Sequence, residues 1–120
     1  QEALGVSLSS QAMLRKALRT FIRYGIKKVL ISMGAEGIAA SDGSREVWVR
    51  CPVVKAGHTV GCGDAALAGF LAAHLRGRGL EACTAHAAAC GYASALADIP
   101  GAIMKKDVRH AFTRRKVTWL

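Results

Sequence analysis

The sequence predicts an α/β fold that forms one domain or part of one. A segment with helical periodicity leads directly into a short apolar run, and two alanine-rich segments follow later in the chain. The 120 residues are 52% hydrophobic and include only two prolines, which is typical of a chain that forms one hydrophobic core. Because a helix that leads into a buried strand is typical of layered α/β proteins, we expect a parallel sheet.

The first predicted element is an amphipathic helix over residues 10–24. Ser9 or Ser10 is suited to cap its start, and Gly25 is suited to end it. Its apolar positions recur with the period of an α-helix and are Leu14, Leu18, Phe21 and Ile22.

Strands are predicted next. The run Val29-Leu30-Ile31 is wholly apolar, which indicates a strand buried on both faces. After a turn at residues 32–37, the segments 38–40 and 46–50 predict a hairpin around the polar turn 41–44. We expect these two more polar strands to flank the buried one.

The second half of the chain is predicted to be mainly helical. A short extended run at residues 53–55 leads into a glycine-rich turn. The alanine-rich helices are expected at residues 64–76 and 81–97, with the turn 77–79 between them, and residues 98–101 end the second. A short last helix is expected at residues 105–115.

The glycine-rich turn carries the most informative chemistry. Gly61 and Gly63 permit close approach of the backbone, and the first N–H groups of the following helix have no partner within the helix. Asp64 places a proton acceptor beside these donors, which suits removal of a proton from a hydroxyl while the donors stabilise a phosphoryl group. The pattern suggests a kinase, although Asp64 could also serve only the helix dipole.

Charge and cysteine content limit the other functions. The net charge of +9 would attract ATP, phosphorylated metabolites or nucleic acid, but no aromatic residues alternate with the basic ones, so we expect no nucleic-acid partner. No apolar run is long enough to cross a bilayer and none resembles a signal peptide, so we expect a soluble, cytoplasmic protein without a membrane partner. The cysteines form no CxxC motif and are expected to be free thiols: Cys51, Cys62, Cys83 and Cys90.

A metal-binding alternative would use Cys83, His86 and Cys90, which share roughly one helix face. Structural zinc sites usually have paired ligands with short loop spacing, and alanines surround these three residues. We therefore predict no metal-ligating side chains.

Four segments resemble the C-terminal half of the ribokinase-like (PfkB) carbohydrate kinases, and most of all their fructose-1-phosphate and tagatose-6-phosphate kinase branch. The segments are SMGAEG (32–37), TVGCGDAALAGFLAA (59–73), AAACGYASAL (87–96) and GAIMKKDV (101–108). The resemblance implies a ribokinase-like three-layer α/β/α sandwich, of which residues 1–120 would be the nucleotide-binding C-terminal part without the sugar-binding N-terminal part. It also implies ATP and Mg²⁺ as cofactors and a sugar or sugar phosphate as substrate, and a homodimer is one assembly to consider.

The resemblance also implies roles for individual residues. Asp64 matches the catalytic base, and Gly61, Cys62 and Gly63 match the anion hole. His58 and Cys62 depart from the residues usual in the family, which are Asn or Asp and Ala. The residues expected to contact the nucleotide are Ser32, Met33, Gly34, Ala35, Glu36, Gly37, Gly63, Ala88 and Gly91.

Two alternatives stay open. The run GCGDAA also satisfies the GxGxxA variant of the dinucleotide-binding fingerprint, but a helix follows where that motif requires a second strand. The chain could instead be a noncatalytic nucleotide-binding remnant of the kinase fold.

Overall fold

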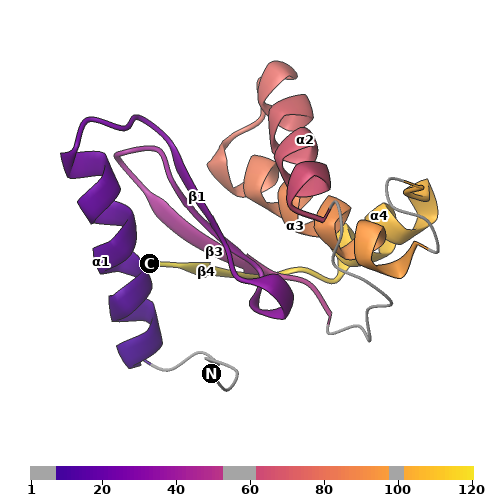
Figure 1. The fold of residues 1–120 in the computed structure, drawn as a ribbon, viewed down its shortest axis with the longest axis horizontal. Helices are drawn as coiled ribbons and strands as arrows, with labels where there is room; N and C mark the ends of the chain where they lie inside the picture. The colour runs from indigo at the N-terminus through magenta and orange to yellow at the C-terminus, as the bar shows by residue number, and fades with distance from the viewer. Residues whose placement is uncertain (1–7, 53–61, 98–101) are drawn as a thin grey trace.

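The computed structural model describes residues 8–52, 62–97 and 102–120, in which a four-stranded sheet separates helix α1 from the other helices (Figure 1). The strand order is β1-β2-β3-β4, and every neighbouring pair is antiparallel. The elements are α1 (Leu8–Arg23), β1 (Val29–Ser32), the 3₁₀ turn η1 (Gly34–Glu36), β2 (Ile38–Ser41), β3 (Glu46–Arg50), α2 (Cys62–Leu75), α3 (Leu80–Leu96), α4 (Lys105–Thr113) and β4 (Lys116–Trp119).

Alternation along β2 and β3 divides the core into two layers. Ala39 and Trp48 pack with α1, in a cluster that includes Leu14 and Leu18. Their chain neighbours point to the other face and pack with α2 and α3 in a second cluster, to which Ile38, Ala40, Val47, Val49, Ala66 and Phe70 belong. Because successive side chains of a strand point to opposite faces, the hairpin fills both layers of the α/β/α sandwich.

The sheet differs from our expectation in two ways. β2 is buried along its whole length, whereas only Val29 is buried in β1, so the hairpin and not the 29–31 run forms the centre of this sheet. The prediction of parallel pairing is also wrong for the described strands. Very short connections join β1 to β2 and β2 to β3, and such connections can only join antiparallel neighbours.

Helix α1 was predicted correctly in position but not in its cap. The helix begins at Leu8, so Ser9 and Ser10 lie inside it rather than before it. Gly25 adopts a φ of +92° and its N–H donates to the Ile22 carbonyl at 3.0 Å, which ends the helix as expected. Phe21 is 43% exposed, since the side chains that reach the sheet follow an i, i+4, i+8 series through Leu14, Leu18 and Ile22.

Strand β4 was not predicted. The last helix ends at Thr113, and residues 116–119 pair with β3 in the register Val47↔Trp119 to Arg50↔Lys116. The Arg45 guanidinium lies 3.9 Å from the centre of the Trp119 ring and covers this sheet edge. The β-branched and aromatic run Val117-Thr118-Trp119 was the available signal.

Helices α2 and α3 begin and end within about two residues of their predicted bounds. The two helices also pack closely against each other. A Cβ added to Gly69 would lie 2.7 Å from the His86 carbonyl oxygen and 2.8 Å from Cys90 Sγ, so the helices could not approach this closely with a larger residue there. The predicted run 53–55 and the predicted turn 98–101 lie outside the described residues. No helix in the described part of the chain is long and apolar enough to span a membrane.

Candidate functional site

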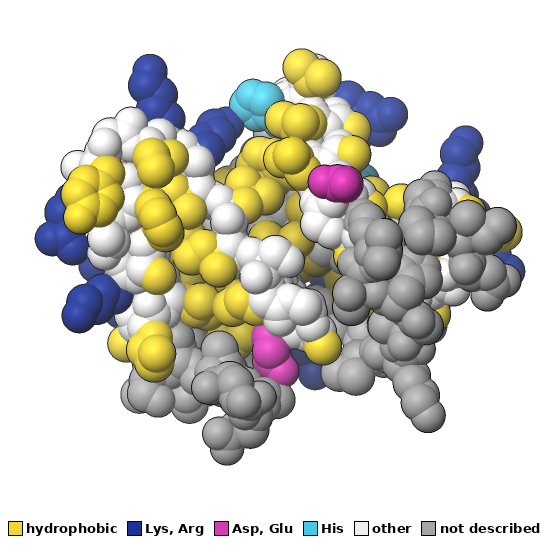
Figure 2. Space-filling model, viewed as in Figure 1, with side chains coloured by type: hydrophobic (Ala, Val, Ile, Leu, Met, Phe, Trp, Pro, Cys, Tyr) yellow, Lys and Arg dark blue, Asp and Glu magenta, His cyan; other side chains and the backbone are white. Residues whose placement is uncertain are grey.

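A cavity of about 300 Å³ opens between the carboxyl-terminal side of β1, the start of α2 and the second half of α3. In Figure 2, hydrophobic side chains line the hollow between the sheet and α2. The volume lies at the lower end of the range for small-molecule sites. The residues that line the cavity are Ser32, Gly34, Ala35, Gly37, Ile38, Cys51, Pro52, Cys62, Gly63, Ala66, Ala88, Gly91, Tyr92 and Ala95.

The turn at residues 33–37 forms one wall and is held by four hydrogen bonds, one of which the Glu36 N–H donates to the Met33 carbonyl at 3.1 Å. The Met33 N–H donates to the Gly37 carbonyl at 2.9 Å, and the Gly37 N–H donates to the Gly34 carbonyl at 3.1 Å. The indole N–H of the fully buried Trp48 donates to the Glu36 carbonyl at 2.7 Å. The turn is therefore anchored to the core of the sheet.

Gly37 is required by this geometry. Its φ is +90°, and a Cβ at this position would collide with the Val49 carbonyl oxygen of the neighbouring strand. Gly34 also has a positive φ, of +58°, but a Cβ there would meet no atom within 4 Å. Only Gly37 therefore combines backbone strain with a steric conflict inside the turn.

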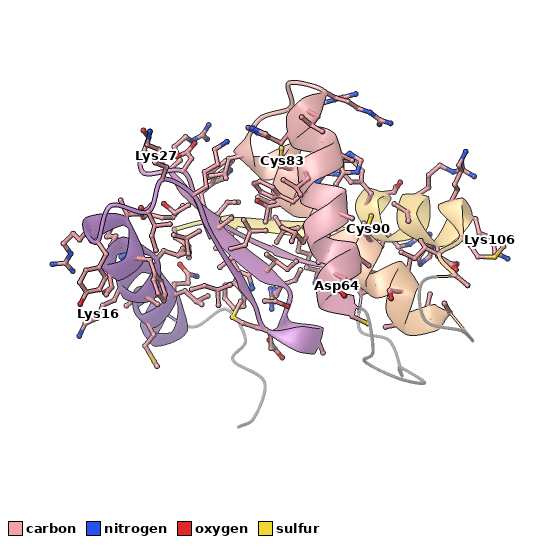
Figure 3. All side chains as sticks on the ribbon, turned by 45° about the horizontal axis from the view of Figure 1, so that its top comes forward. Lys16, Lys27, Asp64, Cys83, Cys90 and Lys106 are labelled. Carbon is pink, nitrogen blue, oxygen red and sulfur yellow. The ribbon has the colours of Figure 1, made fainter. Side chains whose placement is uncertain are left out.

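The start of α2 forms the second wall. Cys62, Gly63 and Ala66 line the cavity, and the N–H groups of a first helical turn have no intrahelical acceptors. Asp64 is exposed in this turn and is not among the lining residues (Figure 3). A carboxylate in a first helical turn, beside backbone N–H groups, can accept a proton from a substrate hydroxyl. Gly61 and His58 lie outside the described residues.

The third wall is one face of α3. Ala88, Gly91, Tyr92 and Ala95 line the cavity at helical spacing. A Cβ on Gly91 would lie 3.7 Å from the Cys62 carbonyl oxygen and 3.8 Å from the Ala66 Cβ, which are ordinary contact distances. Small residues therefore bring α3 close to the start of α2 without crowding it.

The cavity brings together most of the residues that sequence reasoning selected. Those that line it are Ser32, Gly34, Ala35, Gly37, Cys62, Gly63, Ala88 and Gly91. Two others belong to the same turn but have different surroundings: Met33 packs toward the α1 layer, and Glu36 accepts the Trp48 hydrogen bond through its carbonyl.

Other lining residues were missed. Ala95 and Tyr92 share the helix face of Ala88, so helical periodicity could have found them. Ala66 similarly follows Cys62 by one helical turn. Ile38, Cys51 and Pro52 reach the cavity from the predicted hairpin, but the sequence carries no signal that the hairpin packs against α2 and α3.

The described walls of the cavity carry no charged side chain. No Asp, Glu, Lys, Arg or His occurs among its described lining residues. Burial raises the pKa of the Cys51 thiol from 9.0 to about 11, so this side chain is a neutral thiol at physiological pH. The walls therefore favour an uncharged, largely apolar part of a ligand.

The described residues contain no cluster of three potential metal ligands. His86 instead packs its ring against Phe112, with ring centres 4.6 Å apart. Burial, followed by the nearby Arg78 and Arg76, lowers the pKa of His86 and favours its neutral form. Burial also raises the pKa of the Cys83 and Cys90 thiols.

Comparison with known proteins identifies the class. The family model of the pfkB family carbohydrate kinases matches residues 1–103, and the chain therefore belongs to this family. The predicted resemblance and fold class are confirmed.

Individual relatives agree with this assignment. The chain is 41% identical over 69 residues to an uncharacterized sugar kinase from Archaeoglobus fulgidus, an alignment that covers 58% of this chain and 28% of the relative. It is 39% identical over 71 residues to the 1-phosphofructokinase of Xanthomonas campestris, covering 59% and 22%. The chain thus spans about a quarter of the length of these curated relatives.

A solved structure has the same fold. Escherichia coli phosphofructokinase-2, in complex with potassium, superposes with a TM-score of 0.78 at 24% sequence identity. The match covers 90% of this chain and 34% of that one.

Proposed function

We propose that this chain is the nucleotide-binding part of a carbohydrate kinase that transfers a phosphoryl group from ATP to a hydroxyl of a sugar or sugar phosphate. The observation that carries the proposal is the convergence of the 32–37 turn, the start of α2 and one face of α3 on a single cavity. Membership of the pfkB family supports the reaction class, and the similarity to 1-phosphofructokinase supports a sugar phosphate as acceptor.

The cavity suggests how the nucleotide lies. Its uncharged walls suit the base, while the start of α2 offers backbone N–H groups to the phosphates. Phosphoryl transfer needs mainly positioning and charge stabilisation, which rigid walls and oriented backbone donors supply.

Asp64 would act as the base in this reaction. Its carboxylate would accept the proton of the attacking hydroxyl as the new bond from oxygen to the γ-phosphorus forms and the bond to ADP breaks. The N–H groups at Gly61, Cys62 and Gly63 would stabilise the negative charge on the transferred group.

We expect Mg²⁺ to enter the site together with the nucleotide. The described residues form no cluster of three potential ligands, and Mg²⁺ in phosphotransferases is held largely by substrate phosphates and water. When bound, the ion would neutralise phosphate charge, and Asp64 is the carboxylate that α2 carries in its first turn.

Calorimetric titration of the chain with Mg·ADP and Mg·ATP tests nucleotide binding. Gly63→Leu should weaken binding at least about tenfold, since it places a side chain where the phosphates approach, yet a Cβ on Gly63 meets nothing within 4 Å. Ala68→Leu is the matched control, because Ala68 is exposed on the same helix and does not line the cavity. A folded chain that binds neither nucleotide would contradict the proposal.

The alternative of a noncatalytic remnant is motivated by His58, which stands where the family usually has Asn or Asp. Incubation with Mg·[γ-³²P]ATP and a panel of sugars and sugar phosphates separates the two. Transfer that disappears in Asp64→Asn supports the kinase. Nucleotide binding together with a phosphorylation activity that Asp64→Asn leaves unchanged, measured in a longer protein that contains this chain and a sugar-binding part, favours the remnant.

Assembly and location stay predictions. A homodimer can be tested by sedimentation, and a cytoplasmic location by fractionation of the source cells.

A further inference from the structure

One wall of the cavity differs in character from the rest. Most described lining residues are glycine, alanine or other small side chains, and none is charged. Tyr92 is the aromatic residue among them. A slot with small walls and a single aromatic ring suits a flat ring system better than a branched or strongly polar group.

The Tyr92 ring is supported from outside the cavity. It stacks on His110 of α4, with ring centres 6.2 Å apart and an angle of 25° between the planes. His110 is itself held by Arg114, whose guanidinium lies 2.9 Å from Nδ1. A guanidinium can only donate, so in this contact Arg114 donates to Nδ1 of His110.

Tyr92 is well placed on α3 for contact with a ligand. It follows Ala88 by four residues and precedes Ala95 by three, so all three lie on the helix face that lines the cavity. Neither alanine can cover a ligand ring to the same extent. The aromatic contact surface available to a ligand in the described part of this cavity is therefore that of Tyr92.

We propose that Tyr92 stacks on the base of the nucleotide and gives the site a preference for purines, with His110 as a positioning residue that fixes the orientation of the tyrosine ring. The inference rests on the proposed nucleotide site and adds to it the residue that selects the base. Purines have a larger ring system than pyrimidines, so stacking on an aromatic side chain contributes more to the binding free energy of a purine.

Competition with a fluorescent ADP analogue tests the inference, with ADP, CDP and inorganic tripolyphosphate as competitors. Tyr92→Leu keeps an apolar side chain but removes the ring. It should weaken ADP binding by roughly 5- to 150-fold and bring the ADP and CDP affinities close together, because stacking on one base is worth this much. Binding of tripolyphosphate, which has no base, should be unaffected.

Further variants separate stacking from a structural effect. Tyr92→Phe keeps the ring and should restore the preference for ADP. His110→Phe keeps the stacked partner and should preserve it, whereas His110→Ala should reduce it. Tyr24→Leu is the matched control, because Tyr24 is 81% exposed and does not line the cavity.

The outcomes distinguish the two proposals. If the wild-type chain binds ADP and folded Tyr92→Leu binds it equally well, the role of Tyr92 is refuted and the nucleotide site stands. If Tyr92→Phe behaves like Tyr92→Leu, the hydroxyl and not the ring carries the effect, and stacking is refuted. If the folded wild-type chain binds no nucleotide at all, both proposals fail.

Discussion

Gly37 is the position at which a single added methyl group should do most damage to the cavity. The perturbation is Gly37→Ala. The residue joins η1 to β2 with a φ of +90°, and its Cβ would meet the Val49 carbonyl oxygen and lie 3.0 Å from the Arg50 Cα. Both obstacles are backbone atoms of β3, the strand paired with β2, so they cannot rotate away as a flexible side chain would.

The expected cost has two parts. A non-glycine residue in the left-handed region costs about 1–2 kcal/mol. Forcing a methyl group against the fixed strand costs about 1–3 kcal/mol more, because the strands must shift apart. The reduced entropy of the unfolded chain returns about 0.4–1 kcal/mol. Gly37→Ala should therefore lower the free energy of unfolding by about 2–4 kcal/mol.

Gly43→Ala is a matched control. Gly43 has a φ of +92°, almost the same as Gly37, but a Cβ there meets no atom within 4 Å. Its cost should be about 1 kcal/mol, from backbone strain alone. Urea denaturation followed by far-UV circular dichroism measures both variants. Equal losses of stability would refute the steric argument, and a Gly37→Ala protein as stable as wild type would refute the turn geometry itself.

Three further predictions concern the same site. Trp48→Phe removes the hydrogen bond from the indole N–H to the Glu36 carbonyl and leaves a small void. It should lower the free energy of unfolding, measured by urea denaturation, by about 2–3 kcal/mol. A decrease below about 0.5 kcal/mol would contradict the anchoring role of the indole. Gly91→Ala should hold or raise the thermal midpoint, because alanine favours a helix interior by up to about 1 kcal/mol, while it narrows the cavity and weakens ADP binding by about fivefold in calorimetry. Unchanged ADP affinity would place the ligand away from α3. Burial raises the pKa of the Cys51 thiol in the folded chain from 9.0 to about 11, so the unfolded chain loses this proton first as the pH rises. The free energy of unfolding should therefore fall between pH 9 and about 11. Cys51→Ala should flatten this part of the plot of unfolding free energy against pH, and an unchanged plot would show that the thiol is not buried.

The candidate site could be anticipated where local pattern is enough. Local pattern predicted the turn that contains Gly34 and Gly37, the family resemblance implied their contact with the nucleotide, and both line the cavity. Ala88 and Gly91 were selected through the family resemblance and lie on the helix face that forms the third wall. Cys51 was not anticipated, because it follows β3 and reaches the cavity only where the hairpin packs against α2 and α3, a contact that local pattern does not encode.

Several features of the fold were also beyond local pattern. The apolar run 29–31 was expected to lie at the buried centre, but in the structure it lies at the edge of the described sheet and the small residues of β2 lie beneath helices on both faces. Hydropathy measures how apolar a strand is, but burial depends on which neighbours cover it. Strand β4 was missed for a related reason, since four residues after a helix become a strand only when an edge is available for pairing.

The sequence by itself determined the helices, the hairpin, the glycine-rich start of α2 and the kinase family, because each depends on residues that are close together in the chain or on a specific motif. Tertiary structure decided the strand order, the burial of β2, the convergence of three segments on one cavity and the packing of Tyr92 against His110. These features depend on contacts between segments far apart in the chain. The free energy of such contacts comes from packing and pairing, which local sequence does not encode.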